Sequence, residues 1–74
     1  MHEAAGGFVV SDPEILGGAP VFRGTRVPVS SLFEYLADGL SVDYYLEKFP
    51  TVSRDQILAV LNHGQRQIEL ELAA

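Results

Sequence analysis

Turn-forming residues crowd the stretch at 12–29, which reads DPEILGGAPVFRGTRVPV. Its three prolines fix φ at their own positions and keep the preceding residues out of the helical region. Gly17, Gly18 and Gly24 supply positions that accept positive φ. Because so many turns exclude a helix here, this stretch predicts two short extended segments, at 21–22 and 26–27, joined by a tight turn.

Three helices are predicted after this stretch, and the first two are short. Ser30 or Ser31 can cap the first helix, because the pattern SLFE that begins at Ser31 matches a capping box. Gly39 ends this helix. Ser41 caps the second helix, which ends before Pro50.

The third predicted helix is the longest. The pattern SRDQ that begins at Ser53 matches another capping box. Apolar residues then recur at helical spacing, interrupted by Gly64, which marks a bend or an early stop. The alternation of Ile68, Leu70 and Leu72 fits a strand better than a helix, so these last residues are predicted to be extended in a complex.

The motif GGAPVFRGTRVPV and the later FPT occur in a specific order and spacing. With them, the chain resembles the family known as domain of unknown function 433 over roughly residues 8–67. The resemblance implies a mainly α fold, in which a three-helix, helix-turn-helix-like core of homeodomain or winged-helix type follows a short N-terminal β-hairpin. It also implies the antitoxin half of a toxin–antitoxin pair, with a PIN-like nuclease as the toxin, and no enzymatic activity.

The 74 residues are predicted to form one domain, with a hairpin and turn region at 8–29, a trihelical core at 30–67 and a tail at 68–74. The first residues, including His2, are expected to be frayed. Hydrophobic residues make up 47% of the chain, whereas a domain of this size buries only about 60–65% of its unfolded surface. We therefore expect a homodimer in which residues 8–29 and the third helix share the interface.

The chain is acidic, with a formal net charge of −5. Phosphate contacts supply much of the free energy of nucleic-acid binding, so this charge opposes tight DNA binding and suits a partner with a basic surface. The sequence has no cysteine, no apolar run long enough to cross a bilayer and no signal-peptide pattern. A cytoplasmic protein with no membrane contact is the expectation.

Few residues suggest a ligand or an active site. Arg23 and Arg26 flank a rigid turn, where two guanidinium groups can clamp a phosphate or a carboxylate. The structural alternative is that they pair with Glu14, Glu34 or backbone carbonyl groups and hold the hairpin against the helices. His63 has no partner at metal-ligand spacing, and the serines fall at helix starts. We therefore predict no catalytic residue, cofactor or metal ion.

Two functions fit these observations best. The candidate DNA contacts are two residues at the start of the third helix and the two arginines of the turn: Arg54, Gln56, Arg23 and Arg26. The candidate partner contacts are the aliphatic residues of the tail: Ile68, Leu70 and Leu72. The favoured function is a non-enzymatic antitoxin that masks a nuclease-like toxin and binds operator DNA as a dimer. The alternative is a stand-alone helix-turn-helix regulator that binds DNA, and a weaker third function is a structural subunit of an enzyme complex.

Overall fold

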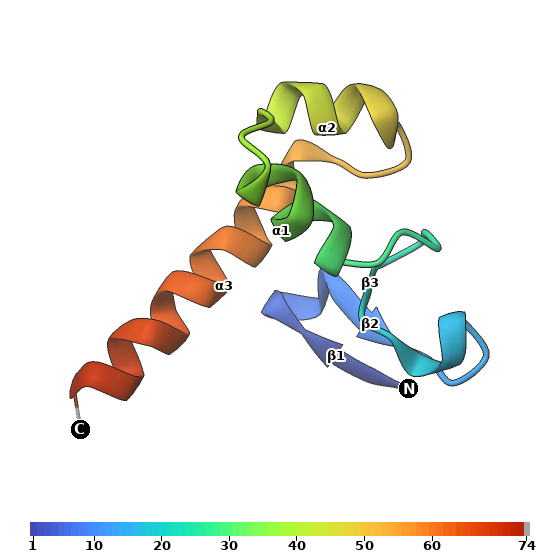
Figure 1. Ribbon diagram of the computed structural model, residues 1–74. Coiled ribbons are helices and arrows are strands. Elements are labelled where there is room, and N and C mark those ends of the chain that lie inside the picture. Colours follow the sequence, from blue (N-terminus) through green and yellow to red (C-terminus); the bar gives the residue numbers. More distant parts are fainter. Residues whose placement is uncertain (74) are drawn as a thin grey trace.

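The computed structural model describes residues 1–73 and shows a small sheet followed by three helices (Figure 1). The strands and the 3-10 turns that connect them are β1 (His2–Ala4), η1 (Ala5–Gly7), β2 (Val9–Ser11), η2 (Leu16–Gly18) and β3 (Val21–Phe22). The helices are α1 (Ser30–Ala37), α2 (Val42–Lys48) and α3 (Arg54–Ala73). The chain is therefore mainly α with a small sheet at its N-terminus, as the sequence predicts.

The sheet has three antiparallel strands in the order β1-β2-β3, where the sequence predicted only a hairpin. Val10 of β2 pairs with Glu3 on one side and with Val21 on the other. The expectation of a frayed start is wrong, because the chain reverses sharply at η1 and lays β1 along β2. Ala5 and Gly6 make this reversal with φ values of 53° and 66°, and the two glycines of the motif AAGG are its local signal in the sequence.

The turn that follows β3 has the predicted form. Gly24 takes a φ of 78°, as expected for a reversal that only glycine makes without strain. Phe22 N–H donates to the carbonyl of Val27 at 3.1 Å, and Val21 forms a bridge with Pro28. A second hydrogen bond, from Val29 N–H to the carbonyl of Pro20 at 2.9 Å, flanks this bridge on its other side. The return segment is thus held by a single bridge and is not a full strand.

The predicted starts of the second and third helices are confirmed. Ser41 Oγ accepts a hydrogen bond from Tyr44 N–H at 3.0 Å. Ser53 and Gln56 form a reciprocal capping box, in which Ser53 Oγ accepts from Gln56 N–H at 3.1 Å and Gln56 Oε1 accepts from Ser53 N–H at 2.9 Å. Gly39, at a φ of 84°, follows the end of α1 as predicted.

The predicted cap of the first helix is wrong. α1 begins after Val29, which makes no side-chain capping bond. Ser31 lies inside the helix, where its hydroxyl donates to the carbonyl of Pro28 at 2.7 Å and shares a hydrogen bond of 2.7 Å with the Tyr45 hydroxyl. The serine joins α1 to α2 and is therefore not available as a cap.

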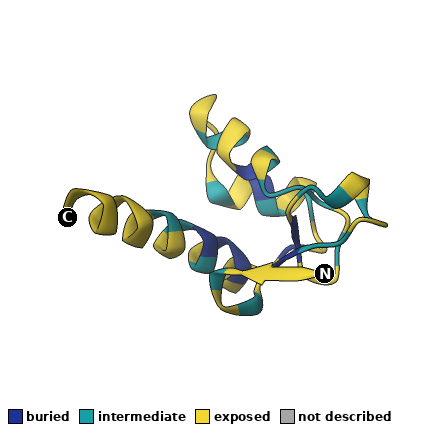
Figure 2. Cartoon of the chain, turned by 90° about the horizontal axis from the view of Figure 1, so that it is seen from below, coloured by how far each residue is buried: buried dark blue, intermediate teal, exposed yellow. Residues whose placement is uncertain are grey.

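The core lies where β2, β3, α1, α2 and the first half of α3 meet (Figure 2). Its buried residues are Val9, Phe22, Leu32, Tyr45, Val52, Ile57 and Val60. Burial raises the pKa of the Tyr45 hydroxyl above its ordinary value, and the hydrogen bond with Ser31 offsets part of this effect. The core brings together residues from both ends of the chain, so the sheet and the helices form one body.

Only half of α3 belongs to this body. The helix continues through Gly64 without interruption, so the predicted early stop does not occur. Every residue at 65–73 is exposed, and this part of the helix extends away from the rest of the molecule (Figures 1 and 2). We call residues 65–73 the free half of α3. The extended form expected in a complex stays a prediction.

Candidate functional site

Arg23 holds the turn after β3 against η1. Its Nε donates to the carbonyl of Gly7 at 2.5 Å, and its guanidinium group forms an ion pair with Glu3. The bond to a backbone carbonyl group agrees with the structural alternative for this arginine, but that carbonyl lies in η1 and not in one of the three helices, and the acidic partner is neither Glu14 nor Glu34. The guanidinium group is about half exposed, so the ion pair adds little to stability and mainly orients the side chain.

The other candidate DNA contacts differ in their exposure and in the intramolecular bonds that their side chains make. Gln56 is only 8% exposed, and its Nε2 donates to the carbonyl of Arg23 at 2.9 Å while its Oε1 completes the capping box. Arg54 forms an exposed ion pair with Asp43 of α2. Arg26 is exposed, and within residues 1–73 its side chain makes no hydrogen bond or ion pair. Gln56 is therefore not available to read a base edge in this conformation.

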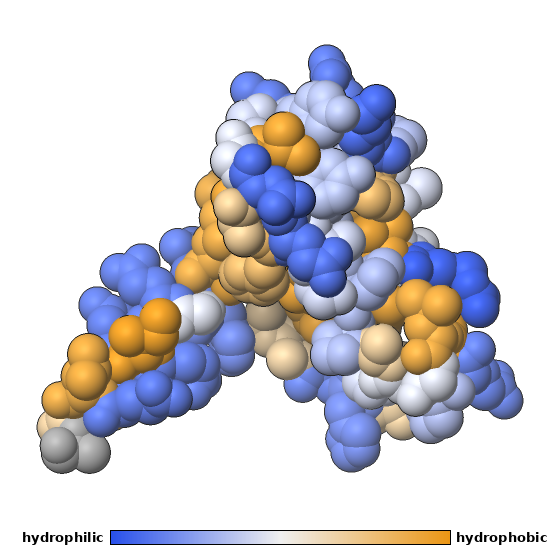
Figure 3. Space-filling view, viewed as in Figure 1, coloured by the Kyte–Doolittle hydropathy of each residue, from blue (hydrophilic) through white to orange (hydrophobic). Residues whose placement is uncertain are grey.

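The three candidate partner contacts are all strongly exposed. The exposed fractions are 59% for Ile68, 60% for Leu70 and 81% for Leu72. Along a helix, Ile68 and Leu72 lie four residues apart on one side, whereas Leu70 lies about 200° away on the opposite side. Apolar surface follows the free half of α3 in Figure 3. The helical conformation thus divides the predicted trio between two sides of the helix.

An apolar hollow opens where α3 leaves the body, and no motif in the sequence indicates it. Its volume is about 190 Å³, and its lining includes Ala5, Val9, Val29, Phe33, Val60 and Gly64. Phe33 stays 47% exposed beside it. No local pattern could have revealed this hollow, because its walls come from β1, η1, β2, α1 and α3 and meet only in the folded chain.

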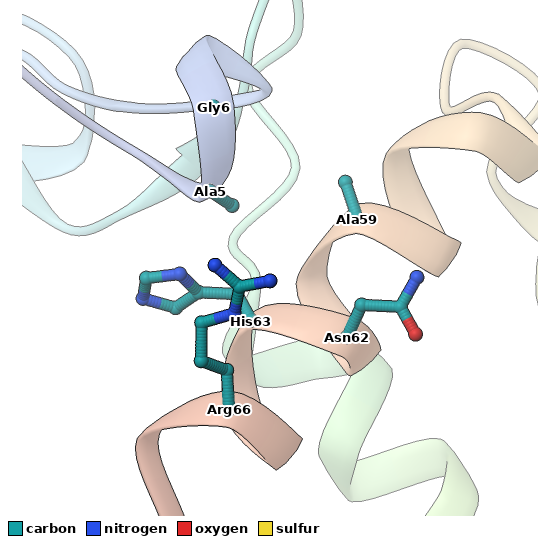
Figure 4. A pocket seen from close by; sticks show the side chains of 6 residues that line it. All are labelled: Ala5, Gly6, Ala59, Asn62, His63 and Arg66. Carbon is teal, nitrogen blue, oxygen red and sulfur yellow. The ribbon is translucent and has the colours of Figure 1, made fainter. Parts of the chain in front are cut away.

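A more polar hollow, also of about 190 Å³, adjoins the same stretch of α3. It is lined by Ala5, Gly6, Ala59, Asn62, His63 and Arg66. Figure 4 shows the His63 and Arg66 side chains lying beside each other and reaching toward η1. His63 lines both hollows. The lining of the apolar hollow therefore includes one polar side chain, that of His63.

Two kinds of feature do not occur in the part of the chain that the structure describes. Within residues 1–73, no three His, Asp or Glu side chains come together in a way that could hold a metal ion. None of the helices there has both the length and the apolar character needed to pass through a bilayer.

An uncharacterized protein, y4eO, of Sinorhizobium fredii (strain NBRC 101917 / NGR234) is 48% identical to the chain over 54 residues. These residues make up 73% of this chain but only 24% of that protein, so the chain spans about a quarter of its relative's length. No solved structure matches the chain.

The family match covers the body apart from β1 and η1, and it does not reach the free half of α3. The family described as "Protein of unknown function (DUF433)" matches residues 9–63. This range contains β2, β3, α1, α2 and the start of α3 up to the residue before Gly64. The match confirms the resemblance predicted from the GGAPVFRGTRVPV and FPT motifs, and the chain belongs to the DUF433 family.

Proposed function

We propose that this chain is a non-enzymatic, cytoplasmic interaction module of the antitoxin type, with a helix-turn-helix-like core. It binds a nuclease-like protein toxin through the free half of α3. The observation that supports this proposal is the exposure of the aliphatic side chains on that half. The free half is held only by its continuity with the packed half of α3, so packing against a partner would stabilise it.

The charge of the chain supports a basic partner. The free half carries Glu69 and Glu71 against Arg66, and the whole chain has a formal net charge of −5. A nuclease must attract phosphate groups, so the surface around its active site is basic. An acidic helix with aliphatic side chains could both approach such a surface and bury apolar area on it.

A stand-alone DNA-binding regulator has less support. Gln56 is buried and bonded at both ends of its amide, and Arg54 is paired with Asp43. A few local contacts would then have to overcome the repulsion between an acidic chain and DNA. We therefore expect operator binding to be weak for the chain alone and to require the more basic toxin.

The test is co-expression of the full chain with the product of the adjacent gene. We expect a stoichiometric complex in which the nuclease activity of that product is lost. Leu70→Asp should weaken the complex, because it removes an aliphatic contact of the free half and would bury an unpaired carboxylate in its place. Leu16→Asp is the matched control, since Leu16 is 50% exposed and lies in η2.

Three results would contradict the proposal. They are the absence of any complex for the wild-type chain, a complex that leaves the nuclease fully active, and equal losses of binding for Leu70→Asp and Leu16→Asp. A gel shift over the chain's own promoter, repeated at several salt concentrations, checks the DNA alternative. Tight binding by the chain alone, unchanged by the toxin, would favour the regulator.

A further inference from the structure

We propose that α3 pairs with α3 of a second copy of this chain in antiparallel orientation. In this dimer, Ile68 and Leu72 of each copy pack against Gly64 and Val60 of the other. The inference goes beyond the proposed function, because it concerns the chain alone and requires no toxin. It specifies which face of α3 is covered and what covers it.

Four residues of α3 form one continuous ridge. Val60, Gly64, Ile68 and Leu72 follow one another at a spacing of four residues, which is the spacing of the rows that interlock when helices pack. The two ends of this ridge have opposite environments. Val60 is 6% exposed and Gly64 borders the apolar hollow, whereas Ile68 and Leu72 are 59% and 81% exposed.

The ridge is complementary to itself. If a two-fold axis passes near residue 66 and relates two antiparallel copies of α3, Val60 of one copy lies opposite Leu72 of the other. Gly64 then lies opposite Ile68. Interlocking of four-spaced ridges gives a crossing angle of about −50°, the commonest class of helix packing. Both copies then use the same surface, as a two-fold dimer requires.

Gly64 fits this arrangement. A glycine inside a helix is destabilising relative to alanine. Nothing in the single copy requires it, since a Cβ atom at this position would meet no heavy atom within 4 Å. Its φ is not positive either. A close approach by a second helix gives a physical reason for a glycine at the centre of the ridge.

The apolar hollow offers a place for the side chains that the ridge presents. Its volume of about 190 Å³ exceeds the roughly 150 Å³ of an apolar cavity that accepts a benzene molecule. Val60 and Gly64 line this hollow. In the proposed dimer they face Leu72 and Ile68 of the second copy, so these two side chains would lie at the mouth of the hollow. An aliphatic side chain entering there would cover the exposed part of Phe33.

The polar groups near the ridge also fit a second copy. Glu71 accompanies the exposed end of the ridge, whereas His63 stands at the rim of the apolar hollow. A hydrogen bond from the His63 ring N–H to the Glu71 carboxylate across the dimer would oppose the repulsion between two chains that each carry a net charge of −5. Arg66 lies four residues before Leu70, on the side of the helix away from the ridge, and takes no part. A second copy thus matches this surface in both apolar and polar character.

The experiment measures the mass of the purified full chain by light scattering and sedimentation across a concentration series. We expect a dimer for the wild type, and at least a tenfold weaker dimer for Ile68→Asp and for Leu72→Asp. Leu70→Asp is the matched control, because it makes the same change two residues away on the opposite side of the helix, and it should leave the dimer intact. Circular dichroism confirms that each variant remains folded.

A wild type that stays monomeric at high micromolar concentration would overturn the inference. So would a dimer that survives Leu72→Asp and Ile68→Asp, or one that Leu70→Asp weakens as much. Because no toxin is present, these failures are separate from failure of the proposed function, which is measured on the complex.

Single cysteines test the orientation, since the chain has none of its own. The two-fold axis near residue 66 brings Gln65→Cys of the two copies close together, so this variant should form a disulfide-linked dimer on mild oxidation. Ala73→Cys lies far from its mate in an antiparallel pair and should not. Cross-linking of both variants to the same extent would indicate a parallel pair and overturn the proposed orientation.

Discussion

The two halves of α3 share one helical backbone but differ in what holds them. In the first half, Ile57 and Val60 are buried in the core, and Gln56 is fixed by two hydrogen bonds of its side-chain amide. In the free half, Ile68 and Leu72 are as apolar as those core residues but are mostly exposed. Apolar character alone therefore does not determine which residues a single chain buries, and the surplus identifies a surface for association.

The largest predicted effect is the difference in the free energy of unfolding between a substitution in the core and one in the free half of α3. Phe22 is fully buried, so Phe22→Ala should lower the free energy of unfolding by about 3–5 kcal/mol. That is most of the stability of a small domain. Ile68→Ala should change it by no more than about 0.5 kcal/mol in the monomer, because it removes no intramolecular packing. Urea unfolding at low protein concentration measures both, and similar losses would contradict the comparison.

The next effect tests a turn that holds the body together. Gly24→Val should destabilise the fold by roughly 1–3 kcal/mol, because a φ of 78° strains a β-branched residue. A Cβ atom there would meet no other heavy atom within 4 Å, so the loss comes from the backbone and not from a clash. Gly24→Asn is the control and should cost less, since asparagine tolerates positive φ. An unchanged Tm for Gly24→Val would show that the turn adapts.

A smaller effect, confined to alkaline solution, concerns the core tyrosine. Because burial raises the pKa of Tyr45 in the folded state, the neutral hydroxyl stabilises the fold at every pH below the ordinary tyrosine value. This contribution is lost as the pH rises through the higher folded pKa. Tyr45→Phe should flatten the alkaline decline of Tm, and Tyr44→Phe, at an exposed position, should not. Identical declines for all three proteins would refute the assignment.

The smallest predicted effect concerns Gly64, which lies where the packed half of α3 ends and the free half begins. Gly64→Ala should stabilise the single chain by about 0.5–1 kcal/mol, because the fold leaves room for the methyl group and alanine favours the helix. The same change should weaken the proposed dimer, where a second helix approaches this position. Thermal unfolding at low protein concentration measures the gain in monomer stability, and sedimentation at high concentration measures the loss of dimer affinity. A destabilised monomer would mean that the body itself needs this glycine.

Local patterns in the sequence predicted much of the body. Ser41 and the pair Ser53 and Gln56 cap helices as their spacing indicates, and Gly24 takes the positive φ that its turn requires. Each of these features depends on residues no more than a few positions apart. β1 and the cap of α1 were missed because they depend on distant partners, such as the Tyr45 hydroxyl that engages Ser31.

The candidate site was predicted less completely for the same reason. The aliphatic residues of the tail are visible in the sequence, but whether Ile68 and Leu70 share a face depends on the choice between strand and helix. Gln56 has the polarity of a base-reading residue, and only the fold shows that its amide is buried. The hollow beside Phe33 has walls from five separate elements, so no window of the sequence contains it.

Gln56 also has a consequence for how the chain folds. One side-chain amide completes the first turn of α3 and, through Arg23, closes a loop of 33 residues. Nucleation of a helix and closure of a long loop are usually separate entropic costs that a folding chain meets at different times. Here the same rotamer serves both, so the start of α3 and its contact with the turn after β3 should form together in the folding transition state, with similar φ-values on the two sides of the bond.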